Sequence, residues 1–447
     1  MKILFVSLGC DKNLVDSEVM LGLLSRAGYE FTDDETEAEV IVVNTCCFIG
    51  DAKEESINTI LEMAAQKETG KCKVLIVSGC LAQRYKDEVL KEIPEVDGIL
   101  GTASCDKIVE VVEETLKGKK GQEFENIDLL KARDGGRIVT TGGHYAYLKI
   151  AEGCDKHCTY CVIPSVRGKY RSVPMEELVK EARELAEGGV RELILVAQET
   201  TLYGMDLYGE KRLPALLKEL AEIPGIHWIR MLYCYPEEIT DELIETIKTE
   251  EKVCHYMDIP IQHASDRILR RMGRRTNREE ITGRIRRLRE EIPDIAIRTT
   301  MITGFPGETE EDLEELLDFV DEMEFERLGV FPYSREEDTP AAVMEDQVPE
   351  EIKAERRSQV MELQQDISLE HGEDMVGREL EVFIEGRVAD ENAYVGRTYM
   401  DAPGVDGYIF VNTDLELMSG MFVRVKVTGA LEYDLIGELC DENESAQ

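Results

Sequence analysis

The chain has 447 residues, with 52 Lys and Arg against 93 Asp and Glu, so its formal net charge is −41. Such an acidic surface repels nucleic-acid phosphates unless a local basic patch overrides it, and it attracts basic proteins. No apolar run approaches the roughly 18 residues of a membrane span, and the first residues lack the pattern of a secretory signal. We therefore expect a cytoplasmic protein with no membrane association and about two to four domains.

Residues 1–116 alternate short apolar runs with helical stretches. The runs are KILFVS at 2–7, VIVVN at 40–44 and KVLIVS at 73–78. Strands that alternate with helices form parallel sheets, so we predict an N-terminal parallel αβ sheet domain over 1–116. The charged, glycine-containing stretch at 117–136 is interpreted as a linker.

A second αβ series covers 140–371. Its six strand candidates are AYLKIA, RELILVA, WIRMLY, YMDIPI, IAIRTTMI and RLGVFPY. Six βα repeats favour a partial, open (βα)6 barrel with functional residues at the C-terminal ends of its strands. Short alternating runs over 373–440 predict a third domain, a small five-stranded antiparallel β-barrel.

Three cysteines directly follow the first strand of this series. The stretch AEGCDKHCTYC places them at Cys154, Cys158 and Cys161. Thiolates bind soft metals and iron–sulfur clusters, and four ligands are usual for a closed site. Three ligands on a four-iron cube leave one iron free to chelate a small molecule, as an open zinc position admits water. The alternatives are a zinc site or unrelated thiols.

This cysteine pattern resembles the radical S-adenosylmethionine superfamily, whose usual architecture is a partial αβ barrel with the triple after the first strand. The resemblance implies that the open iron binds the amino and carboxylate groups of S-adenosylmethionine. One-electron cleavage then gives a 5′-deoxyadenosyl radical that abstracts hydrogen. An aromatic residue just before the last cysteine lies near the adenine in that superfamily, and Tyr160 stands at this position.

The resemblance implies further cofactor neighbours. Gln198 and Glu199 end the second barrel strand, where related enzymes hold the amino group of the cofactor, although strand-end polar residues also bond backbone. Gly304, in ITGFPGET, is interpreted as a cofactor neighbour because glycine lets the backbone approach a ligand. This loop resembles the GxIxGxxE element of the superfamily, but Glu308 falls one place late.

A second set of three cysteines follows the strands of the N-terminal domain. VSLGC, VVNTC and IVSGC end in Cys10, Cys46 and Cys80. The C-terminal ends of parallel strands share one edge, and adjacent strands are about 4.8 Å apart, so these thiols can converge. Lone buried cysteines are common, which is the alternative. Cys47 points to the opposite strand face from Cys46, so Cys46 is the favoured ligand.

The two trios and the third barrel resemble the methylthiotransferases over essentially the whole chain. Six cysteines fall on the ligand positions of that family: Cys10, Cys46, Cys80, Cys154, Cys158 and Cys161. The resemblance implies two 4Fe-4S clusters, the second of which carries the sulfur to be donated. It also implies S-adenosylmethionine, an external flavodoxin-like electron donor and a TRAM domain at 373–440. The remaining cysteines are interpreted as ordinary thiols, with the roles of Cys47 and Cys234 left open.

Sequence features bear on the substrate. SLGCDKNLVDSE and LVAQETTLYG resemble the branch that methylthiolates the β-carbon of an aspartate in the twelfth small-subunit ribosomal protein. Branches that modify adenosine in transfer RNA typically read GCQMN, where this chain has Asp11 and Lys12. The TRAM region carries 14 acidic and 5 basic side chains, a net charge of −9. That charge disfavours RNA and suits a basic ribosomal protein.

Two alternatives stay open. One is a transfer-RNA adenosine methylthiotransferase, and the other is a non-enzymatic, metal-stabilised scaffold for ribosome assembly. Ten arginines between Arg267 and Arg289 leave contact with ribosomal RNA open. Such a run is more often a solvated helix face with glutamate partners at helical spacing.

Overall fold

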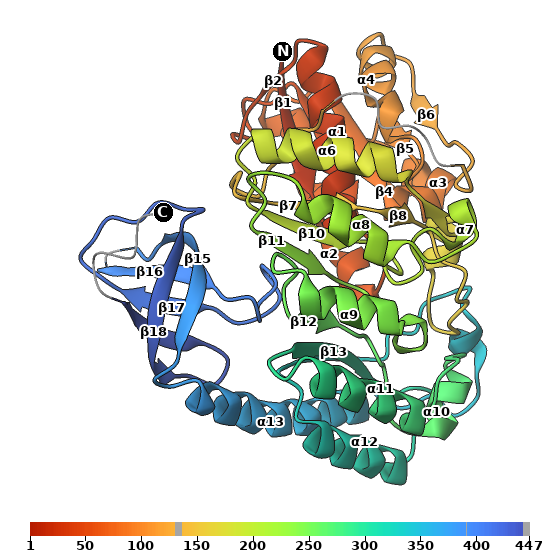
Figure 1. The fold of residues 1–447 in the computed structure, drawn as a ribbon. Helices are drawn as coiled ribbons and strands as arrows, with labels where there is room; N and C mark the ends of the chain where they lie inside the picture. The colour runs from red at the N-terminus through yellow and green to blue at the C-terminus, as the bar shows by residue number, and fades with distance from the viewer. Residues whose placement is uncertain (130–135, 390, 441–447) are drawn as a thin grey trace.

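The computed structural model describes residues 1–129, 136–389 and 391–440. Figure 1 shows the N-terminal sheet domain in red and orange, the central domain in yellow and green, and the C-terminal barrel in blue. The long helix α13 (Glu350–Asp374) leads from the central domain to the C-terminal barrel. Among the described residues, no helix is both long and apolar enough to cross a membrane.

The N-terminal domain is built on a six-stranded parallel sheet in the order β2–β1–β3–β4–β5–β6. Its strands are β1 (Lys2–Ser7), β2 (Glu30–Phe31), β3 (Val40–Thr45), β4 (Val74–Gly79), β5 (Gly98–Leu100) and β6 (Gly121–Glu123). Its main helices are α1 (Asp11–Arg26), α2 (Gly50–Thr69), α3 (Cys80–Glu92) and α4 (Ile108–Leu116). All its strand pairings are parallel, which confirms the predicted parallel sheet. Every residue of β3 and β4 is buried, as in a parallel sheet that is covered on both faces.

The interpretation of 117–136 as a linker was wrong at its start, because β6 pairs there with β5. A strand of three residues is too short to show a hydrophobic period. Its place depends on packing: a side chain at Gly98 or Gly121 would meet Val111 of α4 at about 3.0 Å. The two glycines therefore let α4 lie close to this edge of the sheet.

The central domain contains the six predicted strands, in chain order and all parallel to their neighbours. One sheet holds β7 (Tyr145–Lys149), β10 (Glu192–Val196) and β11 (Trp228–Met231), and the other holds β12 (Tyr256–Asp258), β13 (Ala296–Thr303) and β14 (Arg327–Pro332). The hydrogen bond from the Cys234 amide to the Asp258 carbonyl, 2.8 Å long, joins the two sheets. A short antiparallel pair, β8 (Ala151–Glu152) with β9 (Arg171–Ser172), follows β7. These strands confirm the predicted partial αβ barrel.

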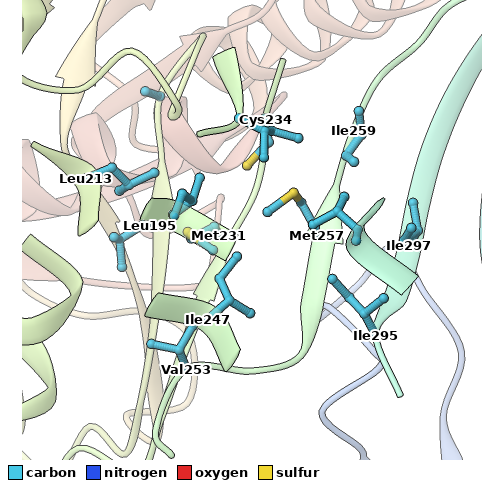
Figure 2. Close-up of a cluster of buried hydrophobic side chains, with 14 of the residues drawn as sticks. Leu195, Leu213, Met231, Cys234, Ile247, Val253, Met257, Ile259, Ile295 and Ile297 are labelled. Atoms are coloured by element: carbon cyan, nitrogen blue, oxygen red, sulfur yellow. The ribbon is translucent and has the colours of Figure 1, made fainter. Parts of the chain in front are cut away.

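One face of this barrel packs against helices. They are α6 (Met175–Glu187), α8 (Leu213–Ala221), α9 (Asp241–Thr249), α11 (Arg278–Glu291) and α12 (Glu310–Met323). Figure 2 shows Leu195, Met231, Met257 and Ile297 from neighbouring strands meeting in this core. Cys234 is fully buried among them, and burial raises the pKa of its thiol well above the usual value. Cys234 therefore acts as a small apolar core residue.

The C-terminal domain is a closed barrel in the order β15–β16–β17–β19–β18. Its strands are β15 (Glu379–Arg387), β16 (Ala393–Arg397), β17 (Ile409–Asn412), β18 (Phe422–Ala430) and β19 (Leu435–Leu439). The prediction of five strands is confirmed, but β17 and β19 run parallel rather than antiparallel. The reason is topological: strand direction cannot alternate all the way round a closed ring with an odd number of strands.

The C-terminal barrel packs against the other face of the central sheet. Ile194 and Val196 of β10 lie in one core with Val382 and Phe383 of β15, and the ring of Trp228 meets that of Phe383 at 5.8 Å between centroids. Side chains alternate between the two faces of a strand, so β10 serves both cores. The central domain is thus held between helices and the C-terminal barrel, while its first strand lies beside the N-terminal domain.

Candidate metal and cofactor site

The structure brings the three N-terminal cysteines to one sheet edge. Cys10 is the N-cap of α1, Cys46 directly follows β3, and Cys80 is the first residue of α3 after β4. The strands β1, β3 and β4 are consecutive in the sheet. Because their carboxyl ends coincide, three residues that are far apart in sequence come together, as the strand-end pattern predicts.

The thiols of this trio lie close enough to influence one another. Burial raises the pKa of Cys46 to about 12, and the neighbouring thiols of Cys80 and Cys10 add to the increase. The N-termini of α1 and α3 act in the opposite sense, because a helix N-terminus favours negative charge. Gly9, with φ of +86°, permits the approach: a Cβ there would lie 2.9 Å from the sulfur of Cys46. The site therefore suits cysteines that a bound metal group keeps in the thiolate form.

Cys47 has different surroundings from Cys46. Its side chain is fully buried in the hydrophobic core of the N-terminal domain. Burial raises its pKa to about 12, and its strongest charged neighbours are Cys80 and Arg84, whereas those of Cys46 are Cys80 and Cys10. These surroundings support the choice of Cys46 over Cys47 as the third member of the trio.

The second trio lies in the loop between β8 and α5 (Ile163–Arg167). The amide of Lys156 donates to the sulfur of Cys154 at 3.5 Å. Thr159, inside the same loop, donates to the backbone carbonyl of Arg271 at 2.9 Å and so holds the loop against α10 (Asp266–Arg271). Burial raises the pKa of Cys161 above its usual value, and the thiols of Cys158 and Cys154 raise it further. The loop therefore gathers all three sulfurs.

Neither trio has the geometry of a single-ion site. Within the described ranges, no three His, Cys, Asp or Glu side chains stand close enough together to hold one metal ion. A zinc site would draw its ligands around one ion, whereas a cluster distributes its cysteines over separate irons. None of the twelve cysteines, all of which lie in the described ranges, is in a disulfide.

Polar side chains at the end of β10 face the second trio. The Gln198 Nε2 donates to Glu152 Oε1 at 2.8 Å, while its own Oε1 is buried without a hydrogen-bond partner. Lys156 Nζ stands 3.2 Å from Glu199 Oε1, but the other carboxylate oxygen of Glu199 is buried without a hydrogen-bond partner. Buried polar atoms in native structures almost always have partners. Gln198 and Glu199 therefore fit a polar ligand at this strand end.

The carboxyl of Glu199 is also perturbed electrostatically. Burial raises its pKa to about 7, although the ammonium of Lys156 acts in the opposite direction. A cationic group bound beside Glu199 would stabilise the ionised form further. Glu199 thus offers a buried carboxyl to a cation at this strand end, and its contact with the cofactor stays a prediction.

Tyr160 is partly buried and packs against the cluster of apolar side chains that contains Phe305. Its ring meets that of Phe305 at 6.4 Å between centroids. Burial raises the pKa of the Tyr160 phenol well above its usual value, followed by the effect of the Cys158 thiol. The aromatic ring thus lies beside the cysteine loop, and its contact with an adenine stays a prediction.

Gly304 and Glu308 have structural surroundings. Gly304 directly follows β13 with φ of +69°, and a Cβ there would lie 2.2 Å from the Cγ of Lys353 on α13. Packing against α13 thus explains the glycine, and its contact with a cofactor stays a prediction. Glu308 pairs with Arg356 at 2.9 Å and with His263 at 3.4 Å, so it ties the loop to α13.

Sequence reasoning missed an ionic network between the two trios. Lys149 of β7 pairs with Asp16 of α1 and, at 2.6 Å, with Glu152. Arg167 at the end of α5 pairs with Asp16 at 2.6 Å and with Glu152 at 3.4 Å. All four side chains are largely buried where the N-terminal domain meets the central domain. The one visible signal was Lys149, a charged residue inside the apolar run AYLKIA.

Half of the ten arginines in the run lie on α11, and the others lie on α10 or in the loop between the two helices. Arg278 and Arg286 both pair with Glu322, at 3.2 and 2.7 Å, and Arg289 pairs with Glu326 at 3.0 Å. Glutamate partners were expected at helical spacing, but most come from the neighbouring helix or the loop after it. Much of the positive charge in this run is therefore neutralised within the protein.

Comparison with known proteins divides the chain into three matches. Residues 2–101 match the family described as uncharacterized protein family UPF0004, residues 148–320 match the radical SAM superfamily, and residues 376–440 match the TRAM domain. Among solved structures, the chain resembles the radical S-adenosylmethionine methyltransferase TsrM from Kitasatospora setae, with cobalamin and a 4Fe-4S cluster bound. That match has a TM-score of 0.55 at 14% identity and covers 76% of this chain and 74% of the other. It supports the fold.

Curated relatives match over nearly the whole length. The chain is 65% identical over 437 residues to the ribosomal protein uS12 methylthiotransferase RimO of Lachnoclostridium phytofermentans, covering 98% of this chain and 99% of the relative. It is 51% identical over 443 residues to the protein of the same name from Clostridium perfringens, covering 99% of each.

The fold, the cysteine loop at the end of the first barrel strands and these matches define a radical S-adenosylmethionine enzyme of the methylthiotransferase class. This class implies a 4Fe-4S cluster and S-adenosylmethionine. The chain belongs to the RimO family of methylthiotransferases.

Proposed function

We propose that this enzyme adds a methylthio group to the β-carbon of an aspartate in ribosomal protein uS12, the twelfth small-subunit protein. The observation that carries the substrate is the 65% identity, over 98% of the chain, to a relative named for uS12. The acidic TRAM region agrees, because complementary charge steers a basic ribosomal protein to the enzyme. Action on a ribosomal protein places the enzyme in the cytoplasm.

We assign one 4Fe-4S cluster to Cys154, Cys158 and Cys161, and a second to Cys10, Cys46 and Cys80. The support is that each trio is brought together by the fold, that four of the six thiols are buried, and that all six are free of disulfides. When bound, the clusters and S-adenosylmethionine supply the C–H activation and the sulfur, which no polar side chain can provide. A flavodoxin-like protein serves as the external electron donor in this proposal.

The side chains near the second trio bind and orient the cofactor. Gln198 Oε1 and the free oxygen of Glu199 receive its amino group, and the Tyr160 ring lies along its adenine. Gly304 supplies backbone at the neighbouring strand end. Support comes from the buried unpartnered oxygens of Gln198 and Glu199. The surrounding barrel core keeps water away from the reacting carbon.

Contact with ribosomal RNA is a secondary part of the proposal. Arg270, Arg275 and Arg284 belong to the arginine run and lie outside the ion pairs with α12. Such arginines would contact phosphates near the target protein, and this contact would weaken as salt increases. The acidic charge of the whole chain limits the contact to this arginine run.

Two measurements test the function. After anaerobic reconstitution, the wild type should hold about eight irons per chain and cleave S-adenosylmethionine. Cys46→Ala should lower the iron to about four, whereas Cys47→Ala, its adjacent control, should leave it unchanged. Mass spectrometry of ribosomal proteins from cells that lack the gene should show loss of methylthio-aspartate in uS12. Loss of methylthio-adenosine from transfer RNA alone would contradict the protein substrate, and zinc in place of iron would contradict the enzyme.

A further inference from the structure

Arg167 occupies the junction between the two cysteine trios. It is the last residue of α5, which directly follows the loop of Cys154, Cys158 and Cys161. Only 3% of its surface is exposed. Its side chain leaves the central domain and enters the N-terminal domain, where its Nη1 is 2.6 Å from Asp16 Oδ2. A buried guanidinium requires such partners on every side.

On one side, Arg167 faces the N-terminal thiols. Burial alone would lower its pKa, but the Cys80 thiol is the strongest of the groups that raise it well above the usual value, and Cys10 also contributes. In return, the pKa of Cys80, which burial raises, is lowered by Arg167. Cys80 is also the first residue of α3, so the helix N-terminus and the guanidinium both favour its thiolate.

Arg167 also anchors the strand ends that carry the other two cysteines. Its Nη2 donates to Asn13 Oδ1 at 3.0 Å. The amide nitrogen of Asn13 in turn donates to the carbonyl of Leu8 at 2.6 Å and to that of Thr45 at 3.3 Å. Leu8 lies just before Cys10, and Thr45 immediately precedes Cys46. The single contact between Arg167 and Asn13 therefore bears on the placement of both cysteines.

On its other side, Arg167 reaches the surroundings of the second trio. Its Nη1 is 3.4 Å from Glu152 Oε2. Glu152 stands two residues before Cys154, and its other oxygen accepts from Gln198 at 2.8 Å. One planar cation is thus connected to both cysteine sites through direct contacts or a single intermediate residue.

We propose that Arg167 is a positioning residue that couples the two cluster sites. It neutralises thiolate charge at Cys80 and Cys10, and through Asn13 it holds the strand ends of Cys10 and Cys46 at the spacing that a cluster requires. Because nearby positive charge favours the more negative, reduced cluster, Arg167 raises the reduction potential of the N-terminal cluster and slows its loss. The inference rests on the proposed second cluster.

The test compares Arg167→Gln and Arg167→Lys with Arg397→Gln. Arg397 is an equally buried arginine that joins the central domain to the C-terminal barrel, through Glu192 at 2.6 Å and Glu385 at 2.6 Å. Each variant is reconstituted as the full chain. The potential of the N-terminal cluster is measured by EPR-monitored titration, in a background with Cys154→Ala, Cys158→Ala and Cys161→Ala. Iron release to a chelator is followed in the two-cluster form, and folding is checked by thermal melting.

Arg167→Gln should shift the potential to a more negative value and speed iron loss from the N-terminal site roughly tenfold or more. Arg167→Lys keeps the charge but not the forked contacts of the guanidinium. Its reduction potential should therefore lie between those of the wild type and Arg167→Gln, while its iron loss stays as fast as that of Arg167→Gln. Arg397→Gln should lower the melting temperature and leave both cluster readouts at the wild-type values.

Unchanged potential and iron release in Arg167→Gln would overturn the inference while leaving the proposed function intact. Equal iron loss in Arg167→Gln and Arg397→Gln would also overturn it, because that result means general destabilisation. A wild type that binds one cluster only would instead contradict the proposed function itself. The three results are distinguishable because the wild-type iron content is measured first.

Discussion

The central domain meets its two neighbours through two buried ionic networks of similar composition. At the C-terminal barrel, Glu192 lies between Arg230 at 2.8 Å and Arg397 at 2.6 Å, and all three side chains are fully buried. At the N-terminal domain, Lys149 and Arg167 lie among Asp16 and Glu152. Each network joins segments more than a hundred residues apart.

The two networks differ in what else their cations face. Arg397 places its remaining donors on Glu385 and on the carbonyl of Asp401, so it is satisfied by carboxylate and backbone oxygens. Arg167 additionally faces the thiols of Cys80 and Cys10. Arg230 of the first network also lies near a thiol, that of Cys254, but Cys254 belongs to neither trio. Thiolates held by a metal group would therefore add negative charge to the second network alone. The network around Glu192 therefore serves to dock the C-terminal barrel, whereas the network around Arg167 docks the N-terminal domain and also contributes to the proposed metal site.

The largest effect on stability is expected from Glu192→Gln. The change leaves Arg230 and Arg397 buried beside each other without their shared carboxylate. Breaking a buried ion pair by removal of one partner costs about 3–5 kcal/mol. The free energy of unfolding measured with denaturant should fall by that amount, while iron content stays at the wild-type value.

Two variants sharpen this comparison. Asp16→Asn should destabilise less, by about 1–3 kcal/mol, because Glu152 still pairs with both cations; yet this variant should lose iron from the N-terminal site. Glu379→Gln removes an exposed pair with Arg424 and should cost no more than about 1 kcal/mol. Iron loss in Glu192→Gln but not in Asp16→Asn would contradict the proposal that only the network around Arg167 bears on the metal site.

Acid should weaken the docking of the C-terminal barrel. Burial alone would raise the pKa of Glu192, but Arg397 and Arg230 hold it below the usual value. The folded-state pKa is thus lower than the unfolded value of about 4.3. The resulting stabilisation is complete above that unfolded value and is lost as pH falls through the folded value.

Melting temperatures of the wild type and Glu192→Gln, measured between pH 7 and pH 3, test this prediction. The gap between the two curves should be widest near neutrality and should narrow in acid. Once Glu192 becomes protonated in the wild type, the difference in melting temperature falls below its value at neutral pH. The protonated carboxyl still fills its site, but it no longer carries the charge that pairs with Arg230 and Arg397. Parallel curves over the whole range would show that ionised Glu192 contributes no pH-dependent stability.

The sequence predicted the elements that carry a strong local pattern. All six barrel strands of the central domain and all five strands of the C-terminal barrel have apolar runs of their own, and the structure contains each of them. The missed strands β2, β5, β6, β8 and β9 have only two or three residues. Such strands exist because a neighbour pairs with them, so no period within them could reveal them.

The site divides in the same way. Each cysteine follows a strand or lies in a compact motif, so its position could be read locally. The ionic networks could not, because Arg167 meets Asn13 across 154 residues and Arg397 meets Glu192 across 205. In a chain with 32% charged residues, Asp16, Glu152 and Arg167 give no signal until the fold brings them together, and only Lys149 stands out, inside an apolar run. Likewise, the packing of Gly304 against Lys353 depends on a helix almost fifty residues further on.

The smallest effect is expected at the exposed ion pairs of α11, which set the baseline for both buried networks. Arg286 pairs with Glu322 at 2.7 Å, and its side chain is 62% exposed. Water and salt screen such a pair, so Arg286→Ala should change the free energy of unfolding by less than about 1 kcal/mol.

Arg278 pairs with the same glutamate, but its guanidinium also lies 5.5 Å from the centre of the Phe319 ring. Arg278→Ala should therefore cost more, through lost packing, and high salt should remove only the smaller effect of Arg286→Ala. A loss at Arg286 as large as that of Glu192→Gln would mean that burial does not explain the strength of the two networks.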